Sequence, residues 1–83
     1  MDDFNALNEA ITKLNISNRQ ALRNPGFVLA DGRTWEQRAA YWASEASALA
    51  DEMGTYLVEL PNYPGRWTAE LFLRLAGNGT EGE

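Results

Sequence analysis

The chain has 83 residues, with 12 acidic and 7 basic side chains, a net charge of −5, and neither His nor Cys. A chain of this length forms one small domain, and without His and Cys it cannot assemble a disulfide or the common zinc ligand sets. The negative charge disfavours direct binding to nucleic acid and favours a partner with a basic surface.

The sequence also lacks the signals of secretion and membrane insertion. The N-terminal segment has no basic region followed by an apolar one, and no apolar run approaches the roughly 18 residues needed to cross a bilayer. Glycine-rich phosphate loops and calcium-loop patterns are absent as well. We therefore expect a cytoplasmic protein that carries no cofactor and no metal and does not contact a membrane.

The first element predicted is an N-terminal helix. Its apolar residues recur at helical spacing behind Asp2 and Asp3, which suit a helix N-terminus, and they are Phe4, Leu7, Ile11 and Leu14. The pattern falters around Asn15, where Ser17 followed by Gln20 has the form of a capping box. This predicts a break and a second short helix over residues 18–23, which ends before Pro25.

Residues 27–30 are apolar and extended in character. Asp31 and Gly32 follow, a dipeptide that favours a type I′ hairpin turn with positive φ at both residues. A tight loop is the alternative, because the strand after the turn would be very short.

The strongest local signals predict a long helix over residues 35–53. Thr34 and Gln37 form a capping box at its start, and Gly54 can adopt the left-handed conformation that ends a helix. An apolar stripe with steps of four and three residues marks its inner face and consists of Trp35, Ala39, Trp42, Ala46, Leu49 and Met53.

The C-terminal part begins with a predicted strand over residues 55–60, which we expect to pair with residues 27–30. Pro64 and Gly65 fit the central positions of a type II turn. A short helix is predicted after Thr68, and residues 77–83 form a flexible acidic tail. The predicted fold is therefore α+β, one helix-dominated domain over residues 1–76 with a central long helix and a two- or three-stranded sheet; an all-α bundle is the alternative.

Two groups of residues are candidates for partner contact. Glu45, Asp51 and Glu52 lie on the long helix, and the last two occupy its final turn, where the helix dipole disfavours negative charge. We interpret them as an acidic patch that receives basic side chains, against the alternative of an ordinary solvated helix face.

The second group comprises Tyr63, Arg66 and Trp67 beside the Pro64 turn, residue types that are enriched at interface hot spots. For Trp67 the alternative is a place in the core. Phe72 joins the candidates because a short C-terminal helix cannot direct all of its apolar residues at one small core.

The sequence shows no catalytic constellation, so we expect a non-enzymatic module that binds and inhibits or regulates a larger protein. In size, acidity and lack of catalytic residues the chain resembles the small phage proteins that disable host machinery, anti-CRISPR proteins among them. This resemblance is one of composition and implies no residue role. The alternative function is a self-associating structural subunit, such as a homodimer.

Overall fold

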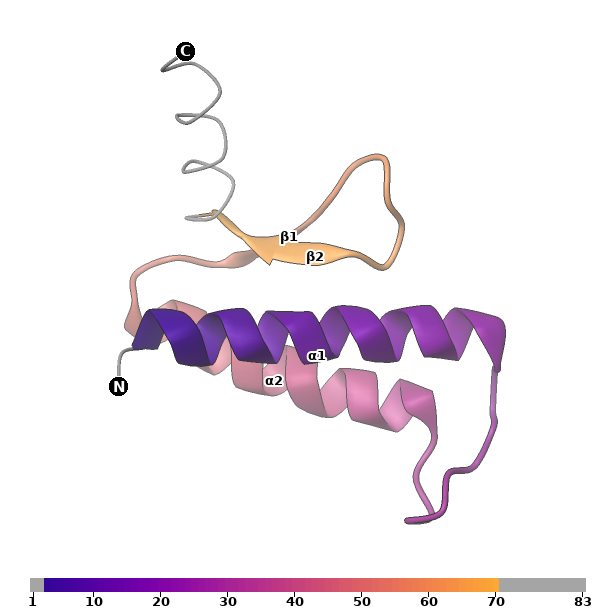
Figure 1. Cartoon of the computed structure of the whole chain (residues 1–83). Helices are drawn as coiled ribbons and strands as arrows, with labels where there is room; N and C mark the ends of the chain where they lie inside the picture. The colour runs from indigo at the N-terminus through magenta and orange to yellow at the C-terminus, as the bar shows by residue number, and fades with distance from the viewer. Residues whose placement is uncertain (1–2, 71–83) are drawn as a thin grey trace.

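The computed structural model describes residues 3–70, which form two antiparallel helices with a β-hairpin packed across them (Figure 1). Helix α1 covers Asp3–Arg23 and helix α2 covers Trp35–Glu52. Strand β1, Leu57–Glu59, pairs antiparallel with strand β2, Trp67–Ala69. The predicted α+β class is confirmed, and the all-α alternative is wrong.

Helix α1 is one continuous helix of 21 residues, longer than the 18 residues of α2. The predicted break near Asn15 and the capping box of Ser17 with Gln20 are therefore wrong. Ser17 is only 4% exposed and lies inside the helix. Two polar residues of this region, Asn15 and Asn18, instead bind the hairpin.

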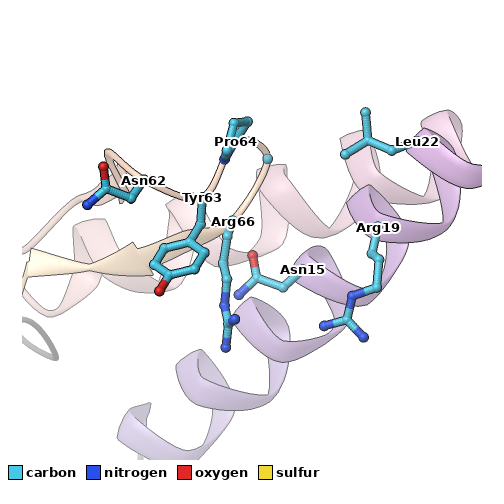
Figure 2. Close-up of a pocket in the computed structure, with 8 residues that line it drawn as sticks. Asn15, Arg19, Leu22, Asn62, Tyr63, Pro64 and Arg66 are labelled. Atoms are coloured by element: carbon cyan, nitrogen blue, oxygen red, sulfur yellow. The ribbon is translucent and has the colours of Figure 1, made fainter.

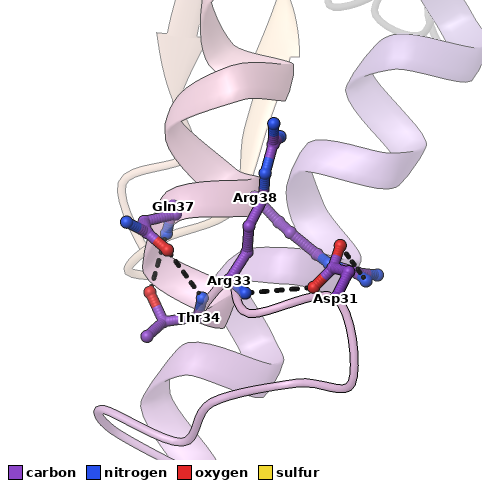
Figure 3. A network of polar contacts seen from close by, with 5 residues as sticks. All are labelled: Asp31, Arg33, Thr34, Gln37 and Arg38. Carbon is purple, nitrogen blue, oxygen red and sulfur yellow. Dashed lines mark hydrogen bonds and ion pairs between the residues drawn. The ribbon is translucent and has the colours of Figure 1, made fainter.

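Helix α2 begins at Trp35 as predicted (Figure 3) and ends at Glu52, one residue before the predicted end. The Thr34 hydroxyl accepts a hydrogen bond from the Gln37 backbone N–H at 3.1 Å, and the Gln37 side chain accepts one from the Thr34 N–H at 2.9 Å. Gly54 has a φ of 76°, the left-handed conformation expected after the helix end. All the start and stop signals of this helix are local, so tertiary packing does not override them.

Replacing Thr34 with alanine is expected to lower the free energy of unfolding by about 1 kcal/mol, because the capping box is lost. Urea denaturation followed by circular dichroism measures this change. Ser44→Ala, an exposed substitution within α2, serves as the control and is expected to have little effect. Equal stability of the two variants would show that the capping box does not contribute.

The segment between the helices forms its own small hairpin. The Gly32 N–H donates to the Leu29 carbonyl at 2.9 Å, and Val28 forms an isolated bridge with Thr34. Gly32 has a φ of 85°, and no residue other than glycine in the described chain has positive φ. The type I′ turn is therefore wrong; the hydrogen bonds fit a three-residue loop with glycine at its left-handed position.

Asp31 explains this conformation, because its carboxylate accepts hydrogen bonds from the Arg33 backbone N–H at 3.1 Å and from the Arg38 guanidinium at 3.0 Å (Figure 3). A side chain bonded to the backbone two residues later is typical of Asx turns. The Arg33 N–H, followed by the Arg38 guanidinium, holds the pKa of Asp31 below its ordinary value. The loop thus joins the start of α2 through side-chain contacts.

Strand β1 falls within the predicted strand but pairs with a different segment. Its partner is β2 and not residues 27–30, and Leu57 lies opposite Ala69. Ala69 therefore belongs to a strand, and the helix predicted after Thr68 begins one residue later, since Glu70 is already helical. Residues 71–77 of that predicted helix and the tail over 77–83 lie outside the described residues.

The turn between the strands has the predicted centre. The Arg66 N–H donates to the Tyr63 carbonyl at 2.9 Å, and Gly65 has a φ of 79°. Pro64 and Gly65 therefore occupy the central positions of this turn, and the positive φ of Gly65 is what a type II turn requires. The hairpin tip is thus built by its own backbone hydrogen bonds.

The core between the helices and the hairpin is small and rich in alanine. Leu7 is the largest side chain that is fully buried. The buried apolar residues are Leu7, Ala10, Ile11, Leu14, Ala39, Ala46, Ala50 and Ala69. Half-buried Trp42, Leu49, Met53 and Leu57 pack against this cluster. Small side chains allow the helices to approach closely, and the larger residues fill the margins of the core.

Candidate functional site

The hairpin is attached to α1 by two asparagine side chains that lie three residues apart, on one face of the helix. The Asn15 amide accepts a hydrogen bond from the Trp67 N–H at 2.7 Å and donates one to the Trp67 carbonyl at 2.8 Å. The Asn18 amide donates to the Gly65 carbonyl at 2.7 Å. Asn15 thus pairs with the outer edge of β2 as a further strand would.

This attachment creates a pocket of about 290 Å³ between the hairpin tip and α1 (Figure 2). We name it the hairpin-tip pocket, and it is lined by Asn15, Arg19, Leu22, Asn62, Tyr63, Pro64, Gly65 and Arg66. Figure 2 shows Asn15 between the side chains of Arg19 and Arg66. The pocket therefore joins two predicted contact residues, Tyr63 and Arg66, to α1.

The rim of the pocket exposes apolar and aromatic surface. Tyr63 is 57% exposed and Leu22 is 71% exposed. The Arg66 guanidinium lies 5.8 Å from the centre of the Tyr63 ring, a distance that allows a cation–π contact. The rim of this one pocket thus offers an aromatic ring beside a planar cation, and a leucine from α1.

The two arginines of the pocket have no acidic partner among residues 3–70. The ion pairs there join Lys13 to Glu9 at 3.3 Å and Arg38 to Asp31 at 3.0 Å. Glu59 lies near the tip, but its carboxylate accepts a hydrogen bond from the Gly65 N–H at 2.6 Å. The guanidinium groups of Arg19 and Arg66 are therefore open to an acidic group from outside.

Sequence reasoning missed Arg19 and Leu22, because contacts between α1 and the tip join residues 47 and 52 positions apart. The sequence signal for this contact was the spacing of Asn15 and Asn18, which places two side-chain amides on one helix face. Such amides can donate to and accept from the backbone groups of a strand edge.

Trp67 does not belong to this pocket. It is half-buried in β2 and lines a different cavity, between the hairpin and α2. Successive residues of a strand point to opposite faces, so Arg66 and Trp67 cannot share one surface. The structure therefore does not bring Trp67 together with Tyr63 and Arg66 on one surface.

The acidic candidates are all exposed on α2 but do not form one compact patch. Glu45 and Glu52 lie seven residues apart and share a helix face, whereas Asp51 lies about 100° around the helix from Glu52. Asp51 lines a cavity with Thr55 and Tyr56 instead. Phe72 lies outside the described residues.

Among residues 3–70, no group of three or more acidic side chains could hold a metal ion, and no helix is long and apolar enough to cross a membrane. Comparison of the chain with protein families, curated proteins and solved structures gave no match.

Proposed function

We propose that the chain is a cytoplasmic protein-interaction module. It binds a larger protein and inhibits or regulates that protein by covering part of its surface. The observation that carries this proposal is the hairpin-tip pocket, which combines exposed Tyr63 and Leu22 with two arginines that lack a described acidic partner. Tyrosine and arginine are among the residues that contribute most to binding energy at interfaces.

The rigidity of the tip supports the same proposal. Arg66 donates to the Tyr63 carbonyl, and the Asn18 side chain bonds the Gly65 carbonyl, so the tip backbone is held before any partner arrives. A preorganised loop loses less conformational entropy on binding than a flexible one. The arginine pair suits a carboxylate that projects from an apolar part of the target.

The acidic end of α2 adds a second feature of the proposed target. Glu45 and Glu52 share an exposed helix face whose negative charge is complementary to basic side chains of a partner. The net charge of −5 favours a basic partner in the same way. A target with a basic surface would therefore meet this face. Inhibition of the kind that phage proteins exert on host machinery remains a proposal from composition.

The double substitution Tyr63→Ala with Arg66→Ala is expected to reduce capture of the specific target by about thirtyfold, the effect of losing a hot spot. Affinity purification from the organism that encodes the chain, followed by titration of the captured protein against each variant, measures the loss. Circular dichroism of each variant establishes that it is folded.

The matched control is Tyr41→Ala with Arg23→Ala. Tyr41 is 48% exposed on α2, and neither residue lines the hairpin-tip pocket. If both doubles bind the target equally well, the tip is not the contact. A third variant, Glu45→Lys with Glu52→Lys, tests the acidic face, whose role is refuted if affinity and its salt dependence stay unchanged.

A further inference from the structure

The outer edge of β1 carries backbone groups that point away from β2. Leu60 donates to the Arg66 carbonyl at 2.8 Å, and Glu70 donates to the Tyr56 carbonyl at 2.9 Å. Hydrogen-bonded pairs alternate along an antiparallel ladder, so the N–H and C=O groups of Leu57 and Glu59 face outward.

The two edges of the sheet differ in whether their outward backbone groups have hydrogen-bond partners. On β2 the outward groups of Trp67 are taken by the Asn15 amide. On β1 the outward backbone groups of Leu57 and Glu59 have no hydrogen-bond partner within residues 3–70, where the sheet has two strands. An unpaired strand edge is a template for an added strand.

An open, largely apolar groove borders β1 at Leu57 and continues past the hairpin tip toward Glu36. It consists of three adjoining cavities of about 390, 470 and 400 Å³, and we name it the α2 groove. Small residues of α2 form one side, namely Ala39, Ala40, Ala43, Ser47 and Ala48, and Tyr56, Leu57 and Trp67 line the other. A third strand beside β1 would lie over these small α2 residues.

Charge marks the two ends of the groove. Glu36, whose carboxylate also accepts a hydrogen bond from the Gly26 N–H at 3.2 Å, lines the cavity at one end, and Asp51 lines the cavity at the other. No Lys or Arg within residues 3–70 lines any of the three cavities. Beside Asp51, the buried Thr55 hydroxyl oxygen has no hydrogen-bond partner among the described residues. The ends of the groove therefore match basic or hydrogen-bonding groups.

We propose that the α2 groove binds an extended segment of a partner protein, which adds to β1 as a third strand and carries a basic residue near each end. Glu36 and Asp51 are 15 positions apart on α2, or about 22 Å along the helix. An extended strand covers that distance in about seven residues. The outward groups of β1 supply the hydrogen bonds, and the small residues of α2 accept its alternate side chains.

Charge disfavours a second copy of this chain as the occupant. A two-fold axis through the groove would set two α2 helices antiparallel, so that Glu36 of each copy would face Asp51 of the other. Like charges would then meet at both ends of the interface. The inference goes beyond the hairpin-tip contact, and its test involves neither Tyr63 nor Arg66.

The test uses the full chain and the capped peptide Lys-Val-Thr-Val-Thr-Val-Thr-Lys. Nuclear magnetic resonance is expected to show saturable binding, with slower amide hydrogen exchange at Leu57 and Glu59. Glu59→Pro removes one outward N–H while sparing the ladder to β2, and is expected to weaken binding at least about tenfold. Glu59→Ala, which removes the same carboxylate but keeps the N–H, is expected to change affinity less than about twofold.

Two further arms test the groove and its charges. Ala40→Trp fills the groove and is expected to abolish binding, whereas Tyr41→Trp, at an exposed position of α2 that lines none of the three cavities, is not. A peptide with Gln at both ends is expected to bind more weakly at low salt than the Lys peptide.

Several results would overturn the proposal. Absence of binding would do so, as would equal effects of the proline and alanine variants at Glu59. Slow exchange at Leu57 and Glu59 in the free chain would mean that the edge is already occupied. A doubled mass in solution would then identify a second copy, and a monomeric mass would identify another part of the same chain.

Discussion

Replacing Leu7 with alanine is expected to lower the free energy of unfolding by about 3 kcal/mol. Leu7 is 0% exposed and is the largest fully buried side chain. Its neighbours in the core include Ala46 and Ala50, which are fixed on a helix and too small to close the resulting cavity. A domain of 83 residues has a total stability of roughly 4 to 12 kcal/mol, so this one change removes a large part of it.

Urea denaturation measures the effect, and Leu22→Ala on the same helix is the matched control. Leu22 is 71% exposed, so the same substitution is expected to change stability by less than about 0.5 kcal/mol. Similar losses in the two variants would contradict the assignment of Leu7 to the core between the helices.

Asn15→Leu is expected to have the second large effect, a loss of about 2 to 4 kcal/mol. The substitution keeps a side chain of similar size but leaves the Trp67 N–H and carbonyl without their Asn15 partners in a partly buried position. The hairpin is therefore expected to separate from α1 more readily than the helices separate from each other. Hydrogen exchange should quicken at Trp67 while the amides inside α2 remain slow.

Two variants distinguish lost hydrogen bonds from a general effect on the helix. Asn8→Leu makes the same change at an exposed position of α1 and is expected to be nearly neutral. Asn15→Asp keeps an acceptor for the Trp67 N–H but loses the donor to the Trp67 carbonyl, so at neutral pH it is expected to destabilise as well. If Asn15→Leu is as stable as Asn8→Leu, the amide does not hold the hairpin.

Helix α2 could be predicted from the sequence because its signals are local. The Thr34 capping box, the apolar stripe and Gly54 act within a few residues of one another. Helix α1 could not be predicted in full, because Asn15 and Asn18 face the hairpin. From sequence alone such polar residues resemble a helix end, since their partners are distant in the chain.

The two turns were located correctly, but the pairing of strands was not. Turn residues determine where the chain reverses direction. The two segments that flank each turn then pair with each other. Val28 therefore bridges to Thr34, and Leu57 pairs with Ala69. The residue type and turn position of Tyr63 predict a contact residue from sequence, whereas the position of Arg19 in the same pocket could be found only from the fold, because Arg19 lies on another element.

The hydrogen bonds that attach the hairpin to α1 involve the backbone of the hairpin and not its side chains. Asn15 binds the N–H and carbonyl of Trp67, and Asn18 binds the carbonyl of Gly65. The side chains of Asn62 and Tyr63 can therefore be exchanged without removing either anchor. A library randomised at these two positions would display many recognition loops on one unchanged scaffold. This small cysteine-free chain is therefore suited to the engineering of new binding proteins.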